Sequence, residues 1–383
     1  MQSKLPATGT TIFAVMSALS EECGAINLSQ GFPSFDPPQA LLDRVTHHLQ
    51  NGANQYAPMQ GTPALRDAVA AKMAMLYDRT VDPDTSVTVT DGATEALFAA
   101  IHAVVRPGDE VIVFDPAYDS YEPAVTLAGG RTIHLPLVTS DIDPDFHIDY
   151  DRLRDSITSR TRLIILNFPH NPTGVIFSKS DLDTLAEILR DTEIFLLSDE
   201  VYEHIVFDGQ RHWSLVTHDE LWERSFVVSS FGKTYHATGW KVGYCVAPPA
   251  LTKEFRKIHQ WICYTVITPV QLAIADYMQM TPEHYEKLPA FYQEKRDRFC
   301  ELVAESRFSL RPAKGTFFQV LDYSEITDED DVDYAKKLTH DIGVASIPVS
   351  VFCETPTDAR LLRFCFAKDD EILEEAASRL CQL

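Results

Sequence analysis

Two kinds of apolar pattern alternate along the first 280 residues. Apolar residues recur at three- and four-residue spacing over 38–50, 63–77 and 94–105, which predicts helices with one buried face. Short apolar runs lie between and after them and predict buried strands, because they are too brief for helices and several are rich in Val and Ile. These runs are 86–90, 110–114, 163–166, 194–198 and 226–229. Alternation of this kind indicates βαβ units and an α/β fold with a mainly parallel sheet.

The pattern changes near residue 281. A long polar helix is expected over 282–306, then a strand over 316–321, a helical segment over 332–342, a strand over 361–367 and a final helix. We therefore expect a large domain over 36–280 and a smaller α/β domain over 281–383. The N-terminal segment, 1–35, is expected to pack on the small domain.

Charge and cysteine content narrow the class of protein. The 383 residues carry a net charge of −23, which disfavours binding to nucleic acid or to an anionic membrane surface. The apolar run over 12–19 is short and broken by Ser17, so no signal peptide or membrane span is expected. Seven cysteines without a CxxC pair predict free, buried thiols rather than a metal site, and they fit a cytoplasmic protein.

Two polar turns follow predicted strands and are candidates for ligand binding. Ala93 and Thr94 follow the strand over 86–90 and open a predicted helix, whose free N–H groups can hold a phosphate. Asn171 lies in a turn with prolines and a glycine after the strand over 163–166, where it could donate to a ligand oxygen. The first turn also fits an ordinary strand-to-helix connection, and the second a common Asn-Pro turn.

A carboxylate and a tyrosine follow the next strand. Asp199 directly follows the apolar run over 194–198, where a carboxylate is costly unless it has a partner such as a protonated pyridine nitrogen. Tyr202 lies three residues further on and can address the same ligand. Alternatively, Asp199 or Glu200 caps the next helix.

Lys233 follows the strand over 226–229 in a segment that contains glycines and serines. Partial burial at this position would lower its pKa and favour the neutral, nucleophilic amine. Ser230 and Lys241 flank it and could both grip a phosphate. An average lysine is solvated on the surface, but the strand context argues against that for Lys233.

Arg363 lies inside the apolar strand over 361–367. If it is buried it needs an anionic partner, and its planar fork matches a carboxylate with two hydrogen bonds. Strand alternation also permits a position on the solvent face.

In this order the motifs resemble the pyridoxal 5′-phosphate (PLP)-dependent aminotransferases of fold type I, in the class I/II group. The resemblance runs nearly end to end, from Asn27 to the strand of Arg363. The segments 28–33, 54–59, 118–121 and 350–353 look most similar to bacterial enzymes that use methionine as amino donor. Kynurenine and glutamine transaminases look like near relatives. The resemblance implies a mainly parallel central sheet with helices on both faces and a smaller α/β domain.

The resemblance also implies a role for each candidate residue. Lys233 would form the Schiff base with PLP and shuttle a proton, and Asp199 would pair with the pyridinium nitrogen. The other implied cofactor contacts are Tyr202 and Asn171 at the phenolic oxygen, Tyr118 on the ring, Ala93, Thr94, Ser230 and Lys241 at the phosphate, and Tyr56 from a neighbouring subunit. The implied substrate contacts, at the α-carboxylate, are Arg363, Asn171 and the Gly31 backbone. Because Tyr56 would reach the phosphate of the neighbouring subunit's site, the resemblance also implies a homodimer. Lys241 departs from the arginine often found in aspartate-type enzymes, although a lysine also suits phosphate.

The activity implied is ping-pong transfer of an amino group to a 2-oxo acid. The expected donor is methionine, with aromatic amino acids, kynurenine and glutamine as further candidates. A cysteine-conjugate β-lyase is the alternative, because site residues alone do not separate it from a transaminase. A non-catalytic PLP-binding regulator normally carries an added DNA-binding module, and both the net charge and the extent of the resemblance argue against it. The partners expected are small amino acids and oxo acids.

Overall fold

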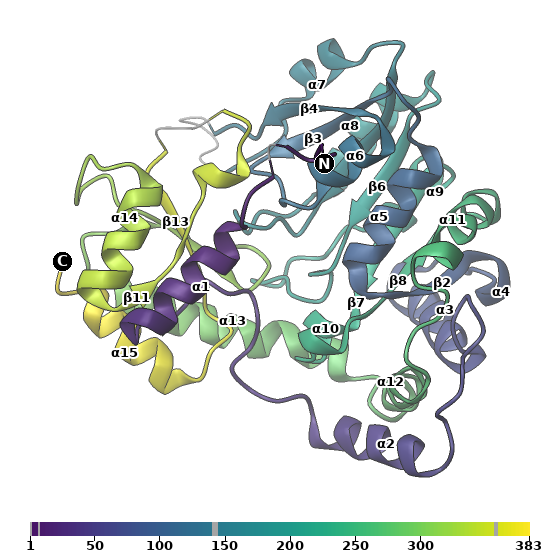
Figure 1. Ribbon diagram of the computed structural model, residues 1–383, viewed down its shortest axis with the longest axis horizontal. Coiled ribbons are helices and arrows are strands. Elements are labelled where there is room, and N and C mark those ends of the chain that lie inside the picture. The colour runs from purple at the N-terminus through teal and green to yellow at the C-terminus, as the bar shows by residue number, and fades with distance from the viewer. Residues whose placement is uncertain (1, 7, 140–144, 356–358) are drawn as a thin grey trace.

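The computed structural model describes residues 2–6, 8–139, 145–355 and 359–383. Its main feature is a seven-stranded sheet with helices on both faces (Figure 1). In spatial order the strands are β2 (Val87–Asp91), β8 (Val242–Val246), β7 (Ser225–Ser230), β6 (Phe195–Asp199), β5 (Thr161–Asn167), β3 (Glu110–Asp115) and β4 (Arg131–Pro136). Neighbours run parallel except at β8, which is antiparallel to β2 and β7. The prediction of a mainly parallel α/β sheet is confirmed.

Successive residues of the central strands enter two different cores. On β5, Ile164 and Leu166 belong to one core and Leu163 and Ile165 to the other. The first core includes α2 (Gln39–Gln50), α3 (Pro63–Tyr77), α7 (Tyr150–Ser156), α8 (Lys179–Leu189) and α12 (Thr268–Met280); the second includes α5 (Gly92–Val104), α6 (Tyr121–Ala128) and α11 (Pro249–Ile262). Shorter helices are α4 (Pro83–Ser86), α9 (Asp219–Trp222) and α10 (Phe231–Thr234). Strands buried on both faces read as continuous apolar runs, which is why the sequence reveals them.

The C-terminal residues form a second, antiparallel sheet of four strands. Its order is β12 (Ile347–Pro348), β13 (Leu361–Cys365), β10 (Phe318–Asp322) and β9 (Ser309–Leu310), accompanied by α13 (His284–Val303), α14 (Asp331–Lys337) and α15 (Asp370–Leu380). The N-terminal segment joins this part (Figure 1). Its strand β1 (Ile26–Asn27) pairs with β11 (Val344–Ala345), and Met16 of α1 (Ile12–Cys23) shares a core with Tyr292 and Phe364. The domain boundaries at residues 35 and 280 remain a prediction.

The predicted elements lie close to the observed ones, with a few differences. The helix expected over 63–77 coincides with α3, and that over 282–306 corresponds to α13. The helix expected over 332–342 is α14 followed by a π-helical turn, Leu338–Ile342. The strand expected from residue 316 begins at Phe318, because Thr316 has a φ of 67°. Several elements were not predicted, among them strands β4 and β8 and helices α1, α6, α7, α8, α11 and α12.

Two expectations about composition can be compared with the structure. All seven cysteines are free, but only Cys245 and Cys365 are buried, so the expectation of burial is wrong for the other five. None of the helices in the described ranges is long and apolar enough to cross a membrane.

A buried ion pair ties α3 to the loop that follows β6. Lys72 Nζ lies 2.5 Å from Glu203 Oε1, and Ser229 Oγ donates to the same oxygen at 2.5 Å. The hydroxyls of Tyr77 and Tyr244 also donate to this carboxylate. Burial alone would raise the pKa of Glu203, but the charge of Lys72 and these hydrogen bonds outweigh it, so the pKa lies well below its usual value. The pair compensates two charges that burial would otherwise make very costly.

We expect Lys72→Met to lower the free energy of unfolding by about 3–5 kcal/mol, because Glu203 is left buried without its counter-ion. The double variant Lys72→Met/Glu203→Leu removes both charges and should recover much of this loss. Urea denaturation followed by circular dichroism measures both. A Lys72→Met protein within about 1 kcal/mol of the parent would contradict the compensation argument.

Candidate active site

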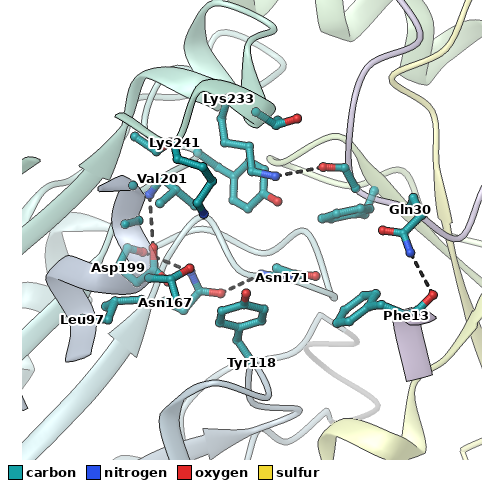
Figure 2. Close-up of a pocket in the computed structure, with 18 of the residues that line it drawn as sticks. Phe13, Gln30, Leu97, Tyr118, Asn167, Asn171, Asp199, Val201, Lys233 and Lys241 are labelled. Atoms are coloured by element: carbon teal, nitrogen blue, oxygen red, sulfur yellow. Dashed lines mark hydrogen bonds between the residues drawn. The ribbon is translucent and has the colours of Figure 1, made fainter. Parts of the chain in front are cut away.

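A cavity of about 250 Å³ lies where several strands of the large sheet end (Figure 2). Of the candidate residues, those that line it are Gly31, Ala93, Thr94, Tyr118, Asn171, Asp199, Tyr202, Ser230, Lys233, Lys241 and Arg363. They come from the N-terminal segment, the start of α5, the loop after β3, the ends of β5, β6 and β7, the turn before β8, and β13 of the second sheet. The structure therefore brings together segments that are up to 332 residues apart, from Gly31 to Arg363. Tyr56 lies elsewhere and its side chain is 83% exposed.

One end of the cavity is suited to an anion. Helix α5 begins there at Gly92, so the first N–H groups of the helix have no partner within the helix. A Cβ atom on Gly92 would lie only 3.0 Å from Lys241 Nζ, and the residue has a φ of 69°, so glycine permits this close approach. Ser230 ends β7 beside the same space and accepts a hydrogen bond from Gly232 N–H at 3.1 Å. Helix start, ammonium and hydroxyl together fit a phosphate group.

Asp199 is a buried carboxylate whose hydrogen-bond donors are neutral. Tyr121 Oη donates to Oδ2 at 2.8 Å and the Val201 N–H donates weakly to Oδ1 at 3.4 Å. Burial raises its pKa to about 6, although these hydrogen bonds and the charge of Lys233 act in the opposite direction. The alternative reading of Asp199 as an ordinary helix cap is not supported, because no helix directly follows β6. A buried carboxylate of this kind suits a protonated ring nitrogen.

Lys233 lies in the short helix α10, directly after β7, and its side chain enters the cavity (Figure 2). Its Nζ donates to the Gly31 carbonyl oxygen at 2.9 Å. The same atom lies 5.1 Å from the ring centre of Phe317 and 5.5 Å from that of Tyr202. Burial lowers the pKa of Lys233 to about 8. A usable fraction of the amine is therefore neutral near physiological pH, which is the condition for a nucleophile or base.

Arg363 is buried, with 1% of its surface exposed, so the solvent-facing alternative is wrong. Its guanidinium stacks on the Phe318 ring at 3.9 Å. Nη1 donates to Asn171 Oδ1 at 2.8 Å and Nη2 donates to the Ser29 carbonyl oxygen at 2.7 Å. In the described part of the chain, Nε has no hydrogen-bond partner. Burial lowers the pKa of Arg363 to about 10. A buried cation with neutral partners and a free donor suits a carboxylate ligand.

Tyr118, Tyr202 and Asn171 complete the walls. Figure 2 shows the Tyr118 ring on the opposite side of the cavity from Lys233. Burial raises the pKa of Tyr118 to about 12 and also raises the pKa of Tyr202 well above its usual value, so both phenols stay protonated and can donate. Since Asn171 Oδ1 accepts from Arg363, its Nδ2 group is left to donate to a ligand.

Sequence reasoning missed several residues of the site. Asn167, at the end of β5, donates from Nδ2 to the Asp199 carbonyl oxygen at 3.0 Å, and its Oδ1 accepts from the Asn171 N–H at 3.0 Å (Figure 2). It thus joins the ends of two neighbouring strands. A polar residue closing an apolar strand was a usable signal for Asn167. No local signal marks Phe13 or Gln30, which reach the cavity from the N-terminal segment.

The residues present fit PLP. The anion-binding end matches its phosphate, the buried Asp199 matches its ring nitrogen, and the amine of Lys233 matches its aldehyde. Among the described residues, no group of three or more His, Cys, Asp or Glu side chains is placed to hold a metal ion.

Comparison with known proteins agrees with this chemistry. The family model for aminotransferase class I and II matches residues 24–380. The chain belongs to this family. It is 52% identical over 382 residues to the methionine aminotransferase of Escherichia coli K12, covering 100% of this chain and 98% of the relative. It is 34% identical to mouse kynurenine–oxoglutarate transaminase 3, covering 96% of this chain and 86% of that one.

Solved structures of the family share the fold. A crystal structure from E. coli, described as having a methionine aminotransferase function, superposes with a TM-score of 0.97 and covers 100% of this chain and 99% of that one. The N-succinyldiaminopimelate aminotransferase of Mycobacterium tuberculosis gives a TM-score of 0.96 at 38% identity, with coverage of 100% and 99%. The predictions of the fold and of an aminotransferase are confirmed.

The raised pKa of Asp199 makes a prediction about the protein stripped of cofactor. Folding raises this pKa from 3.8 to about 6, so the folded state favours the protonated form. Stability is lost as the pH rises through this window, and the full cost is present at pH 8. We expect Asp199→Asn to stabilise the stripped protein by about 3 kcal/mol at pH 8 and by much less at pH 4. Denaturant titration at both pH values measures this, and an equal effect at both would contradict it.

Proposed function

We propose that this aminotransferase binds PLP and transfers the amino group of methionine to a 2-oxo acid in a ping-pong reaction. One observation carries the proposal: a single cavity contains a buried carboxylate, a lysine with a lowered pKa and a buried arginine with a free donor. The 52% identity to a methionine aminotransferase supports the choice of donor. In each half-reaction the same cavity would exchange an amino acid for an oxo acid, or the reverse.

The walls of the cavity would hold PLP by contacts of four kinds. Asp199 would bind the ring nitrogen, and Tyr118 would cover one face of the ring. Tyr202 and Asn171 would donate to the phenolic oxygen, and Ala93, Thr94, Ser230 and Lys241 would surround the phosphate. When bound, PLP supplies an electron sink for the electron pair left when the substrate Cα–H bond breaks.

Lys233 would hold and move the proton. Its pKa of about 8 makes Nζ both an acceptor and a donor near neutral pH. The Gly31 carbonyl oxygen, 2.9 Å away, accepts a hydrogen bond from Nζ and so holds the amine at a defined place in the cavity. Tyr202 and Phe317 pack around the Lys233 side chain and limit the access of water to it.

Arg363 would bind the α-carboxylate and so orient the substrate. Its guanidinium plane is fixed on one face by Phe318 and along one edge by Asn171 and the Ser29 carbonyl oxygen. A carboxylate held by this group places the Cα–H bond in a reproducible position, and such positioning is a large part of catalysis. The Asn171 amide and the Gly31 backbone would assist.

The remaining lining favours an uncharged substrate side chain. Phe13, Leu97 and Phe318 line the cavity, and Arg363 is its one arginine among the described residues. A dicarboxylic substrate needs a second cation, whereas a thioether makes favourable contacts with aromatic rings. Kynurenine is the second candidate donor, because kynurenine transaminases are among the relatives.

We also propose a homodimer in the cytoplasm. Tyr56, Trp261, Tyr264 and Ile267 are large apolar side chains that a single chain leaves exposed, and such surfaces commonly mark protein interfaces. A second copy of the chain would cover them and would bring Tyr56 to the phosphate of the partner's site. Seven free cysteines support a reducing compartment.

The absorption spectrum of the purified protein tests the function directly. The visible band of bound PLP should disappear when L-methionine is added without an oxo acid and return when a 2-oxo acid follows. Lys233→Ala should lose both the native band and the exchange, because no other amine occupies its place. A band that methionine leaves unchanged would refute methionine as donor, and kynurenine, glutamine and aromatic amino acids would then be assayed in turn. Release of pyruvate and ammonia from a cysteine conjugate would reveal the β-lyase alternative.

Arg363→Lys tests the substrate site separately from the cofactor site. Lysine keeps the charge but loses the two-pronged geometry, so we expect the KM for methionine to rise by about thirtyfold. The spectrum of bound PLP should stay unchanged. Arg298→Lys, at an exposed ion pair with Glu374, is the matched control and should leave KM unaltered. An unchanged KM in Arg363→Lys would refute the proposed role of Arg363 in binding the substrate α-carboxylate.

A further inference from the structure

In the segment that carries Tyr56, every second backbone carbonyl oxygen accepts a hydrogen bond from a side chain. The Gln55 carbonyl oxygen accepts from Thr268 Oγ1 at 2.6 Å, and that of Ala57 accepts from Thr265 Oγ1 at 3.1 Å. The carbonyl oxygen of Met59 accepts from His259 Nε2 at 2.9 Å. Three side chains from the end of α11 to the start of α12 thus hold the odd-numbered carbonyls.

The Tyr56 side chain takes no part in these hydrogen bonds and projects from the molecule. It is 83% exposed and meets the Tyr264 ring edge-on, with ring centres 5.8 Å apart. The end of the segment is fixed as well, because the Val89 N–H of β2 donates to the Gln60 carbonyl oxygen at 3.0 Å. The backbone around Tyr56 is therefore held by hydrogen bonds within its own chain.

His259 differs from the two threonines because it has a second partner in another element. Its Nδ1 lies 2.9 Å from Glu95 Oε1, and both side chains are buried. Glu95 stands in the first turn of α5, and its Oε2 accepts from the Asp91 N–H at 3.3 Å. The carboxylate therefore closes the same turn that contains Ala93 and Thr94, which line the cavity.

The hydrogen-bond partners of His259 show where its ring carries hydrogen. The Met59 carbonyl oxygen can only accept, so Nε2 of His259 carries a hydrogen. An ionised Glu95 also only accepts, which requires a hydrogen on Nδ1 as well. Burial alone would lower the pKa of His259, but the hydrogen bond and charge of Glu95 outweigh it, and the pKa lies above its usual value. A buried pair of this kind is sensitive to the loss of either partner.

We propose that the His259–Glu95 pair couples cofactor binding at the start of α5 to the presentation of Tyr56 at the subunit interface. The inference rests on the proposed function, in which PLP binds at this turn and a second copy of the chain supplies Tyr56. His259 is then a positioning residue that touches neither cofactor nor substrate. A phosphate that orders the α5 turn stabilises Glu95, and through His259 it stabilises the Met59 carbonyl and the Tyr56 segment. By thermodynamic linkage, dimerisation tightens PLP binding by the same factor.

The test compares Glu95→Gln and His259→Leu with the parent protein. Sedimentation velocity gives the dimer dissociation constant with and without PLP, and absorbance titration gives the PLP dissociation constant. We expect PLP to tighten the parent dimer by about tenfold, and both variants to reduce this factor to less than about twofold. The PLP affinity of the variants should fall by about tenfold. Glu95→Gln keeps the size of the side chain, so it still tests the coupling between PLP binding and dimerisation if His259→Leu does not fold.

Two control variants separate coupling from general damage. Thr265→Val removes the hydrogen bond to the Ala57 carbonyl oxygen but keeps the contact between His259 and Glu95 of α5. It should therefore weaken the dimer, and PLP should still tighten it. His102→Gln alters a half-buried histidine further along α5, which bonds only to the Phe98 carbonyl oxygen among the described residues, and should change neither constant.

The possible outcomes are distinct. Variants that keep the parent's tightening factor would overturn the coupling alone, and so would variants that weaken the dimer but keep the parent's PLP affinity. A parent protein that binds no PLP would overturn the proposed function together with this inference. A parent that binds PLP, but whose dimer PLP does not tighten, would overturn the coupling and leave PLP binding intact.

Discussion

The cost of taking charges out of water determines how the cavity is built. Asp199, Lys233 and Arg363 are each withdrawn from solvent, and burial moves the pKa of each towards the neutral form: up for the acid, down for the two bases. Their hydrogen-bond partners are neutral groups. The compensating charges are therefore expected from ligands, so the same arrangement that costs stability also selects what binds.

The buried ion pair between Lys72 and Glu203 differs from the charges of the cavity. Lys72 and Glu203 are buried as deeply, yet each is the other's counter-ion, and three hydroxyls complete the shell around the carboxylate. That pair fastens α3 to the loop after β6, one residue beyond Tyr202. Compensated charges thus stabilise the backbone, whereas charges without counter-ions line the cavity. Stability and reactivity are thus assigned to different residues.

Much of the fold and of the site could be read from the sequence because both follow strong local rules. Strands buried on both faces appear as apolar runs, and parallel strands collect polar residues at their carboxyl ends, as Asn171, Asp199 and Lys233 show. Edge strand β4 was missed because most of its side chains are only partly buried and it contains Arg131, Thr132 and His134. Helix α1 was missed because only Met16 and Ser20 are fully buried along it. The Tyr121–Asp199 and Glu95–His259 contacts depend on tertiary packing, which a spacing pattern does not encode.

The hydrogen bond between Arg363 and Asn171 has a consequence for the molecule as a whole. Arg363 belongs to the C-terminal sheet, Asn171 follows a strand of the large sheet, and the Ser29 carbonyl oxygen comes from the N-terminal segment. Three segments that lie far apart in the sequence must therefore be aligned before the guanidinium has its full set of partners. The proposed carboxylate site is therefore complete in one relative arrangement of the two sheets, because any rotation that separates Arg363 from Asn171 breaks their hydrogen bond.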